Sequence, residues 1–252
     1  MITTIYYNQK PYTANLLEPI DISVSICNNG VNAWNIPNME ISPVVLGNWI
    51  GDVNKGSSVN FNNILFNPHA HSTHTECIGH ISKHKESIND ELSQFFFISK
   101  LITINPEKKN TDYIITANML KKYIQENEHI DTLVIRTNPN KENQKNINYS
   151  NTNPTYLLED AAKYLNHINI KHLLIDLPSI DKEQDEGLIK SHKAFWGFPN
   201  KCRQGCTITE LIYVPNHIKD GLYLLNLQFV PFRNDASPSR PILFTLNPEI
   251  ST

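Results

Sequence analysis

The sequence has few cysteines and no long apolar segment. Only four of its 252 residues are cysteine, which is too few and too scattered for a disulfide scaffold. Two of them, Cys202 and Cys206, form a C-x-x-x-C pair with no second pair of metal ligands nearby, so we expect ordinary reduced thiols. No apolar run reaches the roughly 18 residues needed to cross a bilayer, and the N-terminus MITTIYYNQK does not resemble a signal peptide. We therefore expect a cytoplasmic protein that has no membrane partner.

The chain also lacks an excess of positive charge. The chain has 22 lysine and arginine residues and 25 acidic residues, which gives a formal net charge of -3, and no long basic cluster occurs. Nucleic acid is therefore not an expected partner. The G-x-S-x-G, Walker A and G-x-G-x-x-G patterns are absent too, which argues against a serine hydrolase elbow and the common nucleotide-binding loops.

The sequence does contain the pattern of a mixed, folded core. A hydrophobic fraction of 40% suits a globular domain. Segments rich in β-branched and aromatic residues predict strands at 20–26, 95–104, 131–136, 172–177, 207–214, 222–230 and 241–246. Helical spacing predicts helices at 116–127, 154–168 and 183–196. Because strands outnumber helices, we predict a single α/β domain over residues 1–252 with a curled mixed sheet and flanking helices. The Asn-rich stretch at 138–153 is predicted to be an exposed loop.

The segment NPHAHSTHTECIGH, residues 67–80, concentrates groups that bind metals. Four of the ten histidines surround Glu76 here: His69, His71, His74 and His80. Neutral imidazole and carboxylate oxygen are standard ligands of zinc and manganese. In an extended segment, residues two apart share a face, so His74 and Glu76 are expected to grip one ion. The alternative is a set of solvent-facing loop histidines that need no partners.

The same segment resembles the H-x-G-T-H-x-D-x-P-x-H signature of the cyclase family, which includes kynurenine formamidases and isatin hydrolases. Thr73, His74, Glu76 and His80 fall on the T, H, D and final H of that signature. Three later segments follow in the family's order. HLLIDLPSID at 172–181 resembles its I-D-x-x-S-x-D strand and turn, TITELIYV its E-N-L strand, and FVPFRNDASPSRPIL its closing S-P-x-R segment. The resemblance runs from about residue 21 to residue 246.

The resemblance implies a fold, a metal and a reaction. The fold is the swivelling β/β/α fold of the cyclases, with one or two divalent ions, zinc or manganese, per chain. The implied ligands are His74, Glu76, His192 and Glu210, and His80 is the implied proton shuttle. The implied reaction is metal-assisted hydrolysis of an amide, formamide or cyclic amide bond in a small molecule. Family members form dimers or tetramers whose subunits help to close the pocket, so a homodimer or homotetramer is expected.

The sequence departs from the family signature at several positions. The first His of the signature is Ala70 here, flanked by His69 and His71. A one-residue bulge in a strand would bring His69 to the ligand face, so we favour His69 over His71 as the replacement. The family's Asp is Glu76, which adds a methylene and changes the expected metal geometry. These departures leave two alternatives open, namely a dehydratase or lactonase that uses the same site, or a small-molecule binding module that has lost a ligand.

Two further patterns allow more than one interpretation. Asp181 follows a predicted strand, where it would either face a ligand or cap the next helix. Trp34, Trp49 and Trp196 would either line an aromatic pocket or pack in the core.

Overall fold

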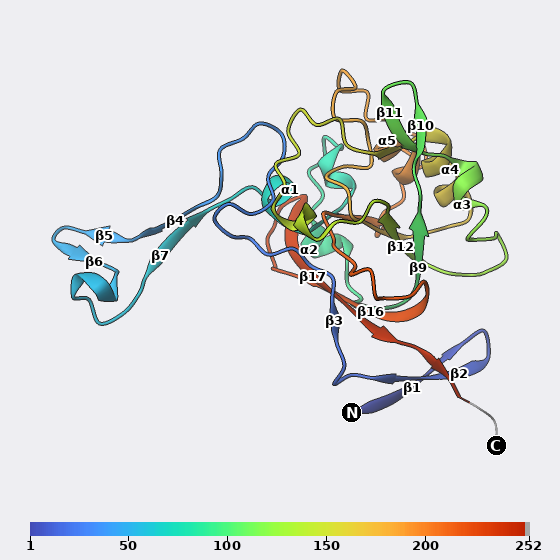
Figure 1. The fold of residues 1–252 in the computed structure, drawn as a ribbon, viewed down its shortest axis with the longest axis horizontal. Helices are drawn as coiled ribbons and strands as arrows, with labels where there is room; N and C mark the ends of the chain where they lie inside the picture. The colour runs from blue at the N-terminus through green and yellow to red at the C-terminus, as the bar shows by residue number, and fades with distance from the viewer. Residues whose placement is uncertain (250–252) are drawn as a thin grey trace.

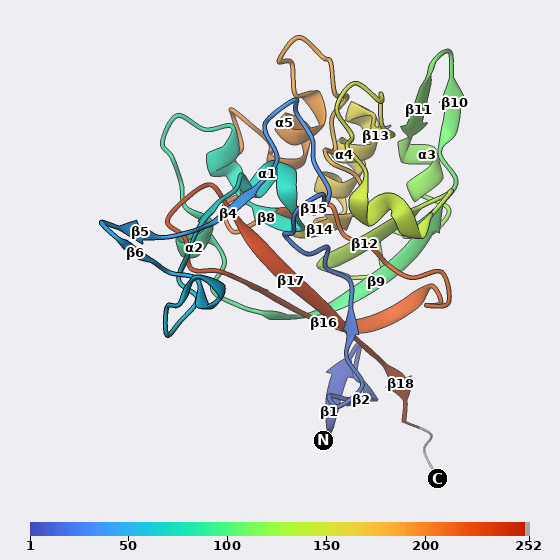
Figure 2. The ribbon, with the colours of Figure 1, turned by 60° about the vertical axis from the view of Figure 1, so that its left-hand side comes forward.

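The strands of the computed structural model form a closed, barrel-like mixed sheet (Figures 1 and 2). The structure describes residues 1–249. Each strand of the barrel pairs with the next, and the last pairs with the first, in the order β16 (Gly221–Phe229), β9 (Phe96–Ile104), β12 (Thr132–Thr137), β14 (His172–Ile175), β15 (Thr207–Glu210), β8 (His74–Glu76) and β17 (Ala236–Thr245). A short strand, β3 (Ile20–Asp21), pairs with the outer edge of β17. The curled mixed sheet that the sequence predicts is therefore confirmed.

The strands on one side of the barrel are parallel and fully buried. β9, β12, β14 and β15 run parallel to one another, and every side chain of β12, β14 and β15 is buried. Parallel strands are usually covered on both faces. Accordingly, Val134 and Leu174 pack against the side chains of β16 and β17, whereas Leu133 and Leu173 pack against helices. Because successive side chains of a strand point to opposite faces of the sheet, each strand contributes to two cores, one on each face.

The helices that cover this sheet are shorter than the sequence predicts. They are α3 (Ala117–Leu120), α4 (Glu159–His167) and α5 (Lys190–Trp196). The helix expected at 154–168 starts late because its first residues form a strand, β13 (Tyr156–Leu157), that pairs with β11 (Asp112–Ile115). The helix expected at 183–196 starts at Lys190 because Gly187 and Ile189 have φ angles of 73° and 41°, which interrupt a helix.

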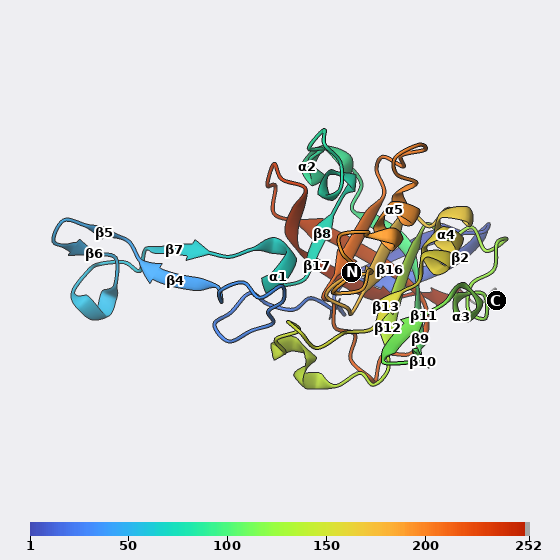
Figure 3. The same cartoon turned by 90° about the horizontal axis from the view of Figure 1, so that it is seen from above.

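Two ribbons extend from the barrel. The first is an arm over residues 40–65, in which β4 (Glu40–Pro43) pairs with β7 (Asn62–Leu65), and its tip carries β5 (Val45–Leu46), β6 (Trp49–Ile50) and the 3-10 turn η1 (Val53–Lys55). Figures 1 and 3 show this arm projecting far from the body of the molecule. The second ribbon joins both ends of the chain through β1 (Ile2–Tyr7), β2 (Lys10–Asn15) and β18 (Asn247–Pro248).

The remaining elements are short. They are the strand β10 (Glu107–Lys109), the helices α1 (Pro68–His71) and α2 (Ile88–Glu91), and the 3-10 turns η2 (Ile78–His80) and η3 (Glu142–Asn146). The turn η3 lies within the Asn-rich stretch. Of the strand expected at 20–26, only the first two residues are a strand. Among residues 1–249, no helix has the length and apolar character that a membrane span requires.

Candidate metal centre

Two strands and two helices bring the expected ligand residues together. In the antiparallel pair of β8 and β15, Glu210 lies opposite His74. His74 and Glu76 lie two apart on β8, which confirms the extended conformation expected for them and places both on one face. The helices α1 and α5 add His69 and His192.

A helical turn, and not the bulged strand expected from the sequence, positions His69 in the cluster. The bulged strand expected there is wrong, because Asn67 caps a single helical turn that starts with Pro68. On this turn His69 faces the cluster. His71 faces away from it, since its Nδ1 accepts from the Asn67 backbone N–H (2.9 Å) and its Nε2 lies 3.0 Å from the Pro37 carbonyl oxygen.

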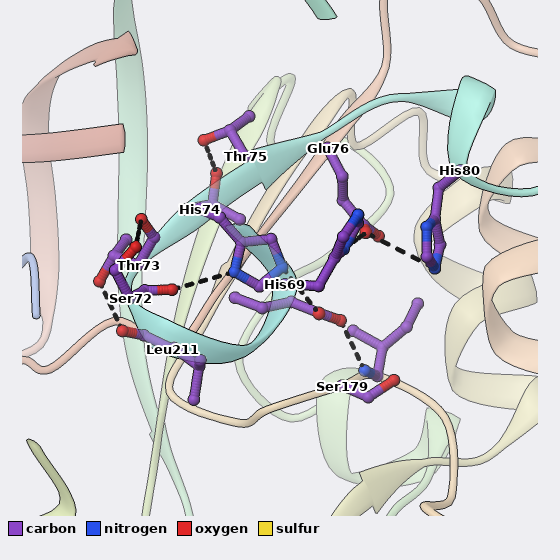
Figure 4. A network of polar contacts seen from close by, with 12 residues as sticks. His69, Ser72, Thr73, His74, Thr75, Glu76, His80, Ser179 and Leu211 are labelled. Carbon is purple, nitrogen blue, oxygen red and sulfur yellow. Dashed lines mark hydrogen bonds and ion pairs between the residues drawn. The ribbon is translucent and has the colours of Figure 1, made fainter. Parts of the chain in front are cut away.

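The carboxylate of Glu76 lies at the centre of the cluster. Its Oε2 is 3.2 Å from His69 Nδ1, and its Oε1 is 3.0 Å from His192 Nε2. Nearby, His74 Nε2 lies 3.5 Å from Glu210 Oε2. Figure 4 shows His74 and Glu76 on the same strand, with the rings of His69 and His80 turned toward the Glu76 carboxylate.

Neighbouring acceptors hold the outer nitrogen of each imidazole. His74 Nδ1 lies 3.0 Å from the Ser72 carbonyl oxygen, and His192 Nδ1 lies 2.6 Å from Asp181 Oδ2. Because Nδ1–H of each ring donates to these acceptors, Nε2 is the nitrogen of both rings that faces the centre. Asp181 also accepts from the backbone N–H groups of Ser191 and His192 at the start of α5. It therefore both caps this helix and orients a ring of the cluster.

The donor set fits a divalent cation. His74 Nε2 and Glu76 Oε2 are buried and have no hydrogen-bond partner, which is rare for buried polar atoms. Ligand atoms of His69, His74 and Glu76 lie within 4.8 Å of one another, and so do those of Glu76, His80 and His192. Imidazole nitrogen and carboxylate oxygen together suit zinc or manganese. The geometry thus brings imidazole nitrogen and carboxylate oxygen atoms around a common centre.

The carboxylates of the cluster raise the pKa of two of its imidazoles, those of His69 and His192. Burial lowers the pKa of His69, but the neighbouring carboxylates of Asp235 and Glu76 outweigh this effect and raise it to about 10. Burial likewise opposes the charge of His192, and Asp181 and Glu76 raise its pKa well above the ordinary value. Although burial raises the pKa of Glu76, the neighbouring His80 and His192 hold it well below the usual range. A bound cation would take the place of these ring protons.

A pocket of about 310 Å³ opens onto the cluster. His80, at the end of η2, stands on its rim with a third of its side chain exposed, and its Nε2 lies 3.9 Å from Glu76 Oε2. Trp34, Ile36 and Ile189 form the apolar part of the wall. Trp34 has a φ of 66° and donates its Nε1–H to the His69 carbonyl oxygen. Of the other two tryptophans, Trp196 is fully buried beside His192, and Trp49 lies on the arm.

One residue of the cluster was not identified from the sequence. Asp235 precedes β17, and its Oδ2 lies 3.0 Å from His69 Nε2 and 3.1 Å from His80 Nδ1. Its only signal in the sequence is its place inside the closing segment FVPFRNDASPSRPIL, whose resemblance to the family lies in the S-P-x-R residues.

Known proteins resemble this chain in sequence and in fold. A family model described as "Putative cyclase" matches residues 20–182. The fold is similar to that of a potential metal-dependent hydrolase with cyclase activity, with a TM-score of 0.63 and 19% identity over 90% of this chain and 98% of the other. A predicted metal-dependent hydrolase from Bacillus stearothermophilus has a TM-score of 0.61 and 21% identity, with the same coverage. An isatin hydrolase bound to the product analogue thioisatinate has a TM-score of 0.63 and 18% identity over 92% and 93% of the two chains. Comparison with curated proteins gives no match.

Proposed function

The chain belongs to the cyclase family, and on this premise we propose that it is a metal-dependent hydrolase that cleaves a carbon–nitrogen bond in a small amide, formamide or cyclic amide. The observation that carries the proposal is the pair of buried, unpartnered ligand atoms, His74 Nε2 and Glu76 Oε2. We assign five side chains as ligands of zinc or manganese, one or two ions per chain: His69, His74, Glu76, His192 and Glu210. A cytoplasmic location accords with four cysteines that are all free.

Different side chains of the protein have different roles in the proposed hydrolysis. A divalent ion bound here would polarise a carbonyl and lower the pKa of a water molecule toward neutrality. His80 is the proposed proton shuttle, because its ring borders both Glu76 and the pocket and imidazole exchanges protons near neutral pH. Asp181 keeps the Nε2 lone pair of His192 directed inward. The apolar wall of Trp34, Ile36 and Ile189 would contact the body of the substrate and exclude water from it.

Metal content is the first test of this proposal. Protein purified without chelator should contain about one or two zinc or manganese ions per chain by elemental analysis. His192→Ala should lose both the metal and turnover, whereas His217→Ala, which changes an exposed histidine outside the cluster, should lose neither. Metal-free but folded wild-type protein would instead support a small-molecule binding module.

A substrate panel is the second test. The metal-loaded protein would be assayed with formanilides, cyclic imides, lactones and hydroxy acids. We expect turnover of the formamides or cyclic amides. Turnover of lactones alone, or dehydration of hydroxy acids alone, would assign the same site to a lactonase or a dehydratase and would contradict the carbon–nitrogen specificity.

We also propose that the protein is a homo-oligomer in which the arm of one copy packs on another copy. Nine large apolar side chains of residues 40–65 are exposed, and only Glu40, Asp52 and Lys55 are charged there. These nine side chains expose roughly 900 Å² of apolar surface, taking typical side-chain areas. A stable interface needs about 800 Å² per partner, so the arm exposes enough apolar surface to form one. A second copy of this chain is the proposed occupant, because most soluble oligomers are homo-oligomers.

Light scattering coupled to size-exclusion chromatography tests the arm. Wild-type protein at micromolar concentration should elute as a dimer or tetramer, and Leu46→Lys together with Leu65→Lys should produce monomers. Leu17→Lys is the matched control, because Leu17 is 72% exposed but lies outside the arm. A monomeric wild type, or an oligomer that survives both arm substitutions, would contradict the assignment.

A further inference from the structure

Asp235 touches two imidazoles of the cluster with one oxygen atom. Its Oδ2 lies 3.0 Å from His69 Nε2 and 3.1 Å from His80 Nδ1, and the two rings lie 4.4 Å apart between centroids. We propose that Asp235 is a positioning residue that fixes the ring protons of both His69 and His80. As a result, a lone pair of His69 faces the metal and a lone pair of His80 faces the substrate. The metal and substrate roles in this inference rest on the proposed function.

Hydrogen-bond chemistry determines the tautomer of each ring. An ionised carboxylate only accepts hydrogen bonds, so both contacting ring nitrogens must donate. His69 therefore carries a proton on Nε2, and His80 carries one on Nδ1. Once a cation has displaced the second ring proton of His69, each neutral imidazole has a single N–H, so the lone pairs lie on His69 Nδ1 and His80 Nε2.

Both lone pairs then point at the same place. His69 Nδ1 lies 3.2 Å from Glu76 Oε2, and His80 Nε2 lies 3.9 Å from the same oxygen. Without Asp235, each ring would be free to place its proton on the nitrogen that faces Glu76. In that state His69 could not bind a cation, and His80 could not accept a proton from the reacting centre.

The backbone holds Asp235 rigidly in this position. Its carbonyl oxygen accepts from the Cys77 N–H (3.0 Å), directly after Glu76, and the next residue, Ala236, pairs with Glu76 in the β8–β17 ladder. The Asn234 carbonyl oxygen accepts from the Ile88 N–H (2.9 Å) at the start of α2. The carboxylate is thus carried by the strand that neighbours the ligands, and its side chain is only 25% exposed.

Histidine tautomers in the zinc-loaded protein test this inference without any substrate. The protein would be labelled with ¹⁵N-histidine, and the His80 signals would be assigned by their loss in His80→Ala. We expect the Nδ1–H form of His80 in the wild type and a mixture with the Nε2–H form in Asp235→Ala. Asp235→Asn keeps the size of the side chain and one acceptor oxygen, so it should lie between the two and also guards against misfolding of the Ala variant.

Zinc affinity is the second readout, measured by competition with a chromophoric chelator. Asp235→Ala should bind zinc about 10–100-fold more weakly than the wild type, as is usual when the partner of a ligating imidazole is removed. If the substrate panel yields a substrate, kcat should fall while KM changes little. Arg233→Ala is the matched control on the same loop, because the Arg233 side chain is 79% exposed and lies 3.9 Å from Asp90, outside the cluster.

Each outcome of these measurements is decisive. An Nε2–H form of His80 in the wild type would overturn the inference, as would tautomers and zinc affinity that stay unchanged in Asp235→Ala. Anomalous scattering that places an ion within bonding distance of Asp235 would also overturn it, because Asp235 would then be a ligand. An inactive protein with the expected tautomers and the expected loss of zinc affinity would contradict the proposed function and leave the positioning role intact.

Discussion

The neighbouring residues His69 and His71 allow a sharp test of the ligand assignment. They lie two apart on one helical turn, yet their rings have different surroundings. The nitrogens of the His69 ring contact Glu76 and Asp235, whereas those of the His71 ring contact backbone groups of Asn67 and Pro37. His69→Ala should therefore weaken metal binding, whereas His71→Ala should lower stability.

The size of each effect follows from these contacts. Zinc sites in proteins bind with about 10–16 kcal/mol, so one of five ligands contributes about 2–3 kcal/mol. His69→Ala should therefore weaken zinc binding roughly 100-fold. The ring of His71 is 4% exposed and makes two hydrogen bonds, so His71→Ala should lower the free energy of unfolding by about 2–3 kcal/mol.

Two assays on the same samples separate the effects. Chelator competition gives the zinc Kd, and urea unfolding of the metal-free protein gives stability. We expect His71→Ala to keep the wild-type zinc Kd and to lose stability. If His71→Ala loses zinc binding while His69→Ala retains it, the geometric argument for His69 is refuted.

Three further predictions concern stability and metal dependence. Burial lowers the pKa of His172 to about 4, whereas the unfolded chain titrates near 6.5. Below about pH 6.5 the unfolded chain takes up a proton that folded His172 does not, so stability should fall by about 3 kcal/mol as the pH drops to about 4. Urea unfolding across this range measures the loss, and His172→Gln should remove it. Gly79→Ala should destabilise the fold by about 1–3 kcal/mol and slow turnover, because its Cβ would overlap the Glu86 carbonyl oxygen and displace His80; a normal melting temperature would contradict this. Dialysis against a chelator should abolish turnover, and added zinc or manganese should restore it; activity that persists without metal would exclude the proposed mechanism.

Local patterns in the sequence were sufficient to predict much of the barrel and half of the cluster. The period of two and the β-branched residues identified the strands at 95–104 and 222–230 to within a residue or two. The same parity placed His74 and Glu76 on one face. These features depend only on residues close together in the chain, so the sequence contains them directly.

Helix boundaries could not be predicted in this way. The segments before α4 and α5 have helical spacing, but Tyr156 and Leu157 pair with a distant strand, and Ile189 adopts a positive φ. In both places contacts or backbone angles set by the tertiary structure override local propensity. The route of His69 into the cluster was missed for a similar reason, since Asn67 and Pro68 start a helical turn where a strand was expected.

The pairing of strands in the closed sheet determines which residues meet at the candidate metal centre. The sequence by itself determined that imidazoles and a carboxylate gather at residues 69–80, because they lie on one short segment. Only the pairing of β8 with β15 and β17 decided that Glu210 lies opposite His74 and that Asp235 reaches His69. Such pairings join segments far apart in the chain, and their register depends on the packing of the whole barrel, which no local pattern records.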